Sequence, residues 1–110
     1  MIQRKALLTA ALGRGRSIER VEVKQIELAP GQATGLHEHP CAVVGYVANG
    51  TITFQIAGES ARRLGQGDAF FEPDNTRIAH FDNASVTEPA TFIAFYLLEA
   101  KNQELIEMLE

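Results

Sequence analysis

The stretch that decides the fold is residues 30–50, which read PGQATGLHEHPCAVVGYVANG. Its two histidines, His37 and His39, are separated by a single residue. On a β-strand such residues project from the same face, because side chains alternate with period two. Both imidazoles can then reach one point in space, which is the geometry that a metal ion needs. The stretch therefore predicts a type of site and leaves the reaction open.

Short apolar runs separated by turn residues extend in both directions from this stretch. Asn49-Gly50 is a strong hairpin signal, because both residues tolerate positive φ. Asn75, in the later turn after Pro73, is expected in the left-handed conformation. A strand or a helical turn is expected at residues 5–9, and strands at residues 20–28, 42–47, 51–56, 61–64, 69–72, 76–81 and 90–98. Many short strands at such intervals predict an all-β sandwich or barrel.

Two segments have patterns of their own. The apolar alternation from Val21 to Leu28 changes parity near Lys24-Gln25, which predicts either a bulge or a strand that serves two environments. Near the end of the chain, Leu105, Ile106 and Leu109 have helical spacing, which predicts a short amphipathic helix at about residues 100–109. We therefore expect residues 1–110 to form a single domain, with a barrel core at about residues 20–98.

Composition excludes several classes of function. A net charge of −4 gives no indication of a face that binds nucleic acid or anionic lipid. The single cysteine excludes an internal disulfide and gives no support for an oxidising compartment. The apolar run at residues 6–12 is too short for a signal peptide, and no stretch approaches the length of a transmembrane helix. We expect a cytoplasmic protein without nucleic-acid or membrane partners.

The spacing of residues 31–50 resembles the first motif of the cupins, a family of small jelly-roll barrels with a double-stranded β-helix fold. That motif has a glycine, five residues, His-x-His, three or four residues, a glutamate, six residues and a glycine. Gly31, His37, His39 and Gly50 match it, whereas Val43 stands in the place of the glutamate. The resemblance implies the cupin fold and a site for a divalent metal ion inside the barrel.

The second cupin motif is also present in altered form. It has a glycine, five residues, Pro-x-Gly, two residues, a histidine, three residues and an asparagine. Gly67 and Pro73 match, Asn75 replaces the motif's glycine and Ile78 replaces its histidine. Asn83 falls one place later than the asparagine of the motif. The resemblance covers residues 21–98, with both motifs in the expected order.

The resemblance implies a set of metal ligands that this chain only partly retains. Cupins typically bind the ion with the two histidines and glutamate of the first motif and the histidine of the second. We expect His37 and His39 as ligands and His80, two residues beyond Ile78, as the third, pointing into the barrel. The ion would be Fe, Mn, Zn or Ni, and a metal-free site is the alternative.

Each candidate also has a structural interpretation. His37 and His39 are alternatively a pair hydrogen-bonded inside the barrel mouth, and His80 a barrel-lining histidine. We expect Cys41 to be a small buried hydrophobic residue, with a thiol ligand as the alternative. For Glu72 we expect a solvated acid at a strand end, with a buried functional carboxylate as the alternative.

Two functions from different classes follow. The first is a metal-dependent enzyme of the dioxygenase or isomerase kind, as the cupin resemblance suggests, in which the ion binds dioxygen or polarises a substrate. The second is a non-catalytic module that binds a small molecule in the barrel without metal, favoured by the apolar Val43 and Ile78. In either case, open sheet edges predict a homodimer with twofold symmetry.

Overall fold

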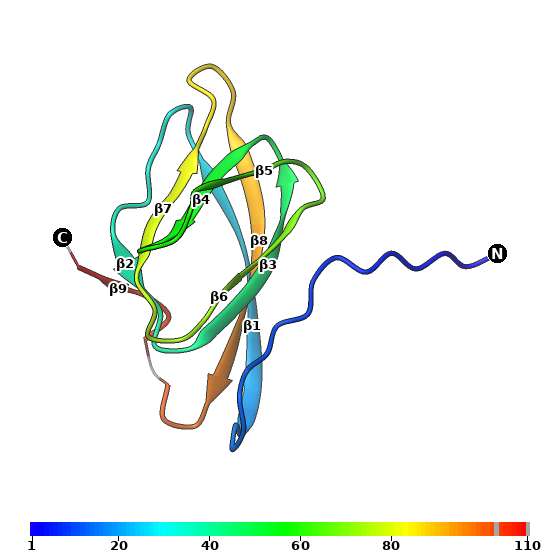
Figure 1. The fold of residues 1–110 in the computed structure, drawn as a ribbon, viewed down its shortest axis with the longest axis vertical. Coiled ribbons are helices and arrows are strands. Elements are labelled where there is room, and N and C mark those ends of the chain that lie inside the picture. The colour runs from blue at the N-terminus through cyan, green and yellow to red at the C-terminus, as the bar shows by residue number, and fades with distance from the viewer. Residues whose placement is uncertain (103, 110) are drawn as a thin grey trace.

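The computed structural model describes residues 1–102 and 104–109, and these residues form nine β-strands. The strands are β1 (Ile18–Leu28), β2 (His37–Glu38), β3 (Ala42–Asn49), β4 (Ile52–Ile56), β5 (Arg62–Leu64), β6 (Ala69–Glu72), β7 (Ile78–Asn83), β8 (Ala90–Glu99) and β9 (Glu107–Met108). They build two sheets with the orders β1-β8-β3-β6 and β5-β4-β7-β2-β9, which face each other across the core (Figure 1). The expected all-β jelly-roll barrel is confirmed. The described residues contain no helix, and so none long and apolar enough to cross a membrane.

Four phenylalanines from both sheets form the centre of the core. Phe54 of β4, Phe70 of β6, Phe81 of β7 and Phe92 of β8 are buried, and their rings pack with centroid distances of 4.6–6.2 Å. Tilted and edge-to-face contacts of this kind are the favoured arrangement of aromatic pairs. Each buried ring contributes about 1.5–3 kcal/mol of transfer free energy. The cluster therefore holds the two sheets together and forms the inner wall next to the histidines.

β1 is one regular strand that serves two environments. Its pairing with β8 is unbroken from Arg20 to Leu28. Val21 and Val23 face outward and are exposed, whereas Ile26 packs against the core and Leu28 is buried. The parity change in the sequence therefore reflects a change of environment along the strand, the second of the two expected alternatives.

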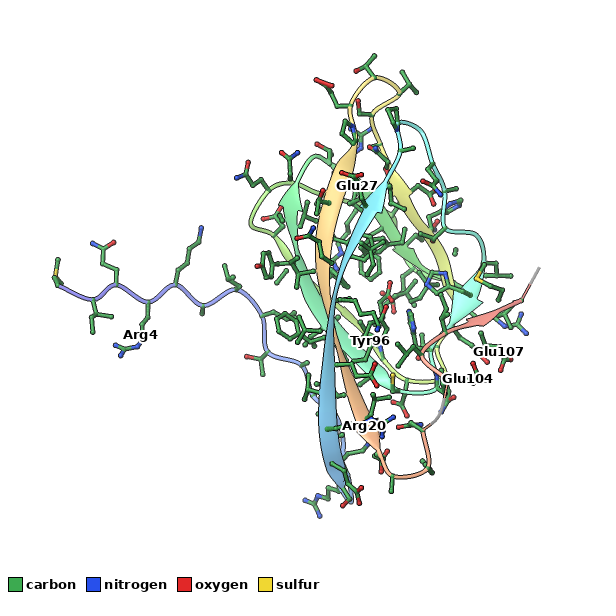
Figure 2. The ribbon with its side chains drawn as sticks, turned by 180° about the vertical axis from the view of Figure 1, so that it is seen from behind. Arg4, Arg20, Glu27, Tyr96, Glu104 and Glu107 are labelled. Atoms are coloured by element: carbon green, nitrogen blue, oxygen red, sulfur yellow. The ribbon has the colours of Figure 1, made fainter. Side chains whose placement is uncertain are left out.

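Two local predictions at turns and termini are wrong. Residues 5–9 belong to no strand or helix, and the N-terminal arm leaves the barrel in an extended conformation, with Arg4 far from the sheets (Figures 1 and 2). Asn49-Gly50 is not the turn of a hairpin, because β3 and β4 lie in different sheets. Gly50 has a φ of 91°, and a Cβ there would lie 2.9 Å from the Cα of Ala90. The turn therefore needs glycine to carry the chain between the sheets.

The C-terminal helix expected at about residues 100–109 is also absent from the described part of this segment, which excludes Gln103. The chain instead forms β9, which pairs with β2 through His37 with Met108 and Glu38 with Glu107. Without β9, one edge of β2 would have unpaired backbone groups, and pairing satisfies them. Leu105 packs against the core. An apolar cluster at helical spacing is thus equally compatible with a strand that closes a sheet edge.

Candidate metal centre

His37 and His39 converge inside the barrel, as their spacing predicts. His37 lies on β2, His39 follows it, and both side chains are buried. Their ring centroids are 5.0 Å apart and the ring planes are nearly perpendicular, at 82°. The two Nε2 atoms face the same space, where they meet a third side chain.

That third side chain is Glu72, which belongs to β6 on the opposite sheet. Glu72 is buried, with only 3% of its surface exposed. Its Oε1 lies 2.8 Å from Nε2 of His39 and 3.9 Å from Nε2 of His37. Ligand atoms from His37, His39 and Glu72 all lie within 4.8 Å of one another. The expectation of a solvated acid at a strand end is therefore wrong, and the buried carboxylate is the correct alternative.

Strand pairing explains how Glu72 reaches the histidines. Phe70 and Glu72 alternate inward along β6. In the ladder between β3 and β6, Glu72 pairs with Val43, the residue that stands where the cupin motif has its glutamate. Directly paired residues point to the same face of a sheet, so the acid enters the site from the neighbouring strand. The alternation of Phe70 and Glu72 was a usable signal, but the pairing partner of β6 could not be read from the chain.

Backbone carbonyl groups determine which nitrogen of each histidine faces the site. Nδ1 of His37 donates a hydrogen bond to the carbonyl of Gly35 at 2.8 Å, and Nδ1 of His39 donates to that of Leu105 at 2.6 Å. A carbonyl oxygen can only accept, so each Nδ1 carries the proton. In the neutral imidazoles, Nε2 therefore presents a lone pair to Glu72. Two lone pairs at 2.8 Å repel unless a proton or another cation lies between them.

The pKa values of His37 and Glu72 are shifted in opposite directions. Burial lowers the pKa of His37, but the nearby Glu72 carboxylate and the hydrogen bond to the Gly35 carbonyl outweigh it, and the net pKa is raised. Burial raises the pKa of Glu72, but the interactions with His37 and His39 outweigh it, and the net pKa is lowered. Without metal, the site thus favours a carboxylate next to a protonated imidazole.

Two turns hold the histidines in place. Asn75 has a φ of 54° and donates its backbone N–H to the carbonyl of His39 at 2.8 Å. The predicted left-handed conformation of Asn75 is confirmed, and it explains how asparagine substitutes for the glycine of the second motif. Gly35 has a φ of 85°, and a Cβ there would lie 3.1 Å from Cε of Met108. β9 therefore passes close to the turn whose Gly35 carbonyl accepts the hydrogen bond from His37.

His80 lies outside this site, and the prediction that it points into the barrel is wrong. Its side chain is 53% exposed, and its Nδ1 lies 2.8 Å from Oδ2 of Asp82. The pairing of β7 with β4 shifts register there: Gln55 pairs with His80 but Ile56 pairs with Ile78. The extra residue reverses the alternation, so Ile78 is buried and His80 faces outward.

Cys41, the other candidate ligand, does not join the cluster of His37, His39 and Glu72 found among the described residues. The residue is buried, and burial raises the pKa of its thiol to about 11. A thiol with that pKa carries almost no thiolate at neutral pH, and the thiolate is the form that binds metals. Cys41 is thus a small buried residue, in agreement with its structural interpretation.

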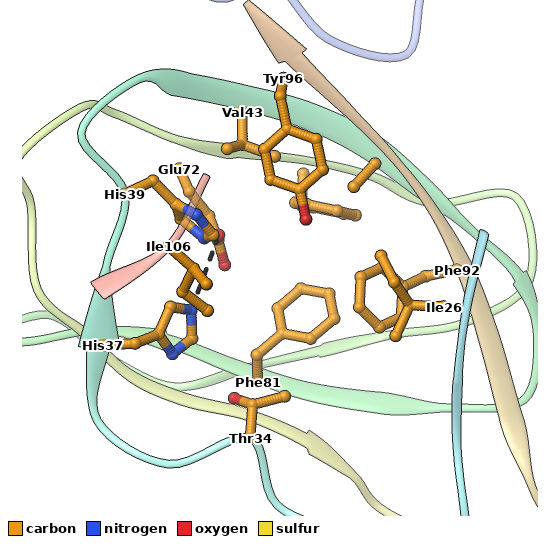
Figure 3. Close-up of a pocket in the computed structure, with 12 residues that line it drawn as sticks. Ile26, Thr34, His37, His39, Val43, Glu72, Phe81, Phe92, Tyr96 and Ile106 are labelled. Carbon is orange, nitrogen blue, oxygen red and sulfur yellow. Dashed lines mark ion pairs between the residues drawn. The ribbon is translucent and has the colours of Figure 1, made fainter. Parts of the chain in front are cut away.

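A cavity of about 140 Å³ borders the cluster of His37, His39 and Glu72 (Figure 3). Apolar side chains form most of its wall, and two hydroxyl groups border it. Tyr96 points its hydroxyl toward the middle of the cavity, and its ring centroid lies 5.8 Å from that of His39. Burial and the Glu72 charge raise the pKa of Tyr96. The lining residues are Ile26, Thr34, His37, His39, Val43, Phe70, Glu72, Phe81, Phe92, Ala94, Tyr96 and Ile106.

The donor set fits a divalent transition-metal ion. Two imidazole nitrogens and one carboxylate on a single side of an ion, with open positions on the other side, are typical of non-haem iron sites and of catalytic zinc sites. The Nδ1 hydrogen bonds to backbone carbonyls are the outer contacts that usually orient metal-binding histidines. His37, His39 and Glu72 would therefore hold such an ion at the border of the cavity.

A comparison with protein families matches this architecture. Residues 24–96, well over half of the chain, match the family model described as the cupin domain. No curated protein sequence matches the chain.

Solved structures with the same fold include several enzymes. A DMSP lyase from Ruegeria pomeroyi superposes with a TM-score of 0.68 at 19% identity, over 81% of this chain and 43% of the lyase. An oxalate oxidase superposes with a TM-score of 0.68 at 21% identity, over 81% of this chain and 46% of the oxidase. A cupin-like protein from Thermotoga maritima has a TM-score of 0.69 and 27% identity, over 81% of this chain and 64% of that protein. The chain thus spans less than half the length of the two enzymes, and the likeness to them shows the fold.

Proposed function

Because the chain belongs to the cupin family, we propose that it is a metal-dependent enzyme acting on a small molecule inside the barrel. His37, His39 and Glu72 are the proposed ligands of one divalent ion, Fe, Mn, Zn or Ni. Glu72 takes the place that the sequence suggested for His80. The reaction belongs to the dioxygenase- or isomerase-like class that the family suggests.

The contact between His39 and Glu72 is the observation that carries this proposal. Nε2 of His39 lies 2.8 Å from Oε1 of Glu72, while the proton of the ring is committed to the carbonyl of Leu105. A lone pair and a carboxylate held together in a buried site need a cation between them. A divalent ion satisfies both groups and includes His37, whose Nε2 faces the same carboxylate.

The surrounding residues supply what such chemistry requires. An ion held by these three side chains would bind and polarise an oxygen of the substrate as a Lewis acid. Phe81, Phe92 and Ile26 line the cavity and exclude water, which strengthens electrostatic interactions inside it. Oxalate oxidase and DMSP lyase, named among the structural neighbours, are enzymes, which is consistent with an enzymatic role for this chain.

Elemental analysis of untagged protein tests the proposal. After metal-free protein is loaded in turn with Fe(II), Mn(II), Zn(II) and Ni(II) and desalted, we expect about one ion per chain for at least one metal. The double variant His37→Ala, His39→Ala should retain none. A matched control is His80→Ala, which removes a histidine outside the site and should retain the full amount. Uptake of none of the four ions by the wild-type protein would contradict the proposal.

The alternative is a metal-free module that binds a small apolar molecule. It is supported by Val43 and Ile78, which are buried at the positions where cupins usually have a glutamate and a histidine. In this case the ion pair of Glu72 with protonated histidine is itself the final state of the site. Retention of a small ligand by the double variant without histidines would favour this alternative.

We further propose that the chain forms a homodimer through the outer face of the β1-β8-β3-β6 sheet. Four apolar residues lie in register across all four strands of that sheet: Val23 pairs with Phe95, Phe95 with Val44, and Val44 with Phe71. Continuous apolar surface of this kind marks protein interfaces. Residues of the N-terminal arm, from Lys5 to Ala10, border a groove on the same face.

Light scattering at micromolar concentration should give the mass of a dimer. Val23→Lys places a charge among the paired apolar residues of the outer face. Val23 is 58% exposed in the single chain, so the variant should fold and remain a monomer. Val86→Lys is the matched control, because Val86 is 83% exposed in the loop between β7 and β8 and belongs to none of the four strands of this sheet. A wild-type protein with the mass of a monomer would contradict the dimer.

A further inference from the structure

We propose that the cavity selects a small monocarboxylate and that the hydroxyl groups of Thr34 and Tyr96 donate hydrogen bonds to its carboxylate oxygens. This inference rests on the proposed function, because the carboxylate would lie on the open side of the ion held by His37, His39 and Glu72.

Thr34 provides the first observation. Its Oγ1 is buried and has no hydrogen-bond partner in the described part of the chain. A buried hydroxyl without a partner is destabilising, and the few that occur in native structures call for an explanation. Thr34 lines the same cavity as the three ligands. A bound oxygen atom in the cavity would supply the missing partner.

Tyr96, on a strand rather than in a loop, provides a second donor. It lies on β8, and its hydroxyl points into the cavity in Figure 3, on the same side as the Glu72 carboxylate. A tyrosine hydroxyl donates one hydrogen bond, and a buried one usually finds a partner. Two donors, one from the loop before β2 and one from β8, thus face one small space, which suits an oxygen-rich group.

Charge selects a carboxylate among oxygen-rich groups. Among the described residues that line the cavity, Glu72 is the only acidic one, and none is a lysine or an arginine. A divalent ion bound by Glu72 and two neutral histidines leaves one net positive charge in a largely apolar cavity. Buried charge is costly unless it is compensated, so a monoanion is favoured over a neutral ligand or a dianion.

Cavity size and its apolar wall limit the rest of the molecule. The volume is about 140 Å³. An apolar cavity of similar size in another protein holds benzene, so a ligand of about six non-hydrogen atoms fits. Ile26, Phe81 and Phe92 line the part of the cavity away from the ligands. The structure therefore assigns a short aliphatic acid, with its hydrocarbon part against these residues.

Calorimetric titration of zinc-loaded protein with propionate tests the assignment. Zinc has no redox chemistry, so binding is measured without turnover. Propionamide is the neutral control of the same shape. The variants are Thr34→Val and Tyr96→Phe, which remove one hydroxyl each with little change of shape, and Thr34→Ser, which retains the hydroxyl. Zinc content and melting temperature are measured for every variant, because neither hydroxyl is a proposed metal ligand.

We expect wild-type protein to bind propionate at least about tenfold more tightly than propionamide, since hydrogen bonds to charged groups are the stronger ones. Thr34→Val and Tyr96→Phe should each weaken propionate binding by about tenfold at unchanged zinc content, and Thr34→Ser should bind as the wild type does. Equal binding of propionate by all variants, or of propionamide and propionate by the wild type, would overturn the carboxylate assignment alone. A wild-type chain that takes up no zinc or other ion would overturn the metal site and this inference together.

Discussion

Glu72 lies directly opposite Val43 in the antiparallel pairing of β6 with β3, and its carboxylate reaches His39 at 2.8 Å. Paired residues on one face of a sheet have Cβ atoms about 4.5–5.5 Å apart, so a side chain at either position can reach the same point. Position 72 therefore supplies a carboxylate on the face where the first cupin motif places one from position 43. The following experiments test what this arrangement means for the site.

Exchange of Glu72 and Val43 should place the carboxylate at position 43, where the cupin motif has it. Glu72→Val should lower metal affinity by at least roughly 100-fold, because a direct ligand contributes more than an outer partner. Adding Val43→Glu to that variant should restore much of the lost affinity, since the new carboxylate points to the same face. Both are measured by competition with a chromophoric chelator. No recovery in the double variant would show that the two positions are not equivalent.

His80→Ala should leave metal affinity within about threefold of the wild type, because His80 lies outside the site. The exposed pair that it forms with Asp82 contributes little to the stability of the fold. The same substitution at His39 should abolish binding at concentrations where the wild type is saturated. Competition titrations of the three proteins under identical conditions make the comparison. A loss of more than tenfold in His80→Ala would return this histidine to the ligand set.

The stability of the metal-free protein should depend on pH in a defined window. Glu72 has a pKa lowered from 4.5, so the stability that it contributes is present above pH 4.5 and is lost as the pH falls through its folded pKa. His37 has a pKa raised from 6.5, so its contribution is complete below pH 6.5 and is lost as the pH rises through its folded pKa. The ion pair therefore stabilises the metal-free protein most between pH 4.5 and 6.5.

The stabilisation that bound metal provides should depend on pH in the opposite way, because metal ions bind deprotonated histidine. Melting temperatures between about pH 4 and 8.5, with and without Zn(II), should show the smallest gain from metal in the acidic window and a larger gain above neutrality. Glu72→Gln should flatten the acidic limb of the metal-free curve. Parallel curves with and without metal across the whole range would argue against coupling between the proton and the ion.

The C-terminal segment should contribute to metal affinity without supplying a ligand. The carbonyl of Leu105 accepts the hydrogen bond from His39, and the N–H of Leu109 donates to the carbonyl of Leu36 at 3.0 Å. A chain shortened to residues 1–102 loses both contacts and should bind metal about tenfold more weakly, as is usual for loss of an outer hydrogen bond to a ligand histidine.

The matched control for this truncation is Glu107→Ala with Met108→Ala, which changes two exposed side chains and keeps the backbone pairing of β9. Hydrogen exchange at β2 should rise in the shortened chain and stay low in the control. If the shortened chain binds metal as the full chain does, the Leu105 carbonyl is not needed to orient His39.

Local pattern alone was enough for the features that depend on neighbouring residues. The alternation of side chains placed His37 and His39 on one face, and turn residues separated the strands of an all-β barrel. The conformation of Asn75 followed from the tolerance of asparagine for positive φ. Each of these properties depends on a few consecutive residues, so a pattern of spacing and residue type predicts it.

Contacts between distant segments decided the remaining features of the site. Glu72 lies in the site because β6 pairs with β3. His80 points out of the barrel because the register of β7 against β4 shifts by one residue. Residues 107–108 form a strand because they pair with the edge of β2. A shift of one residue in strand register moves a side chain to the other face of the sheet, and register depends on pairing across the fold. No short stretch of the chain contains that information.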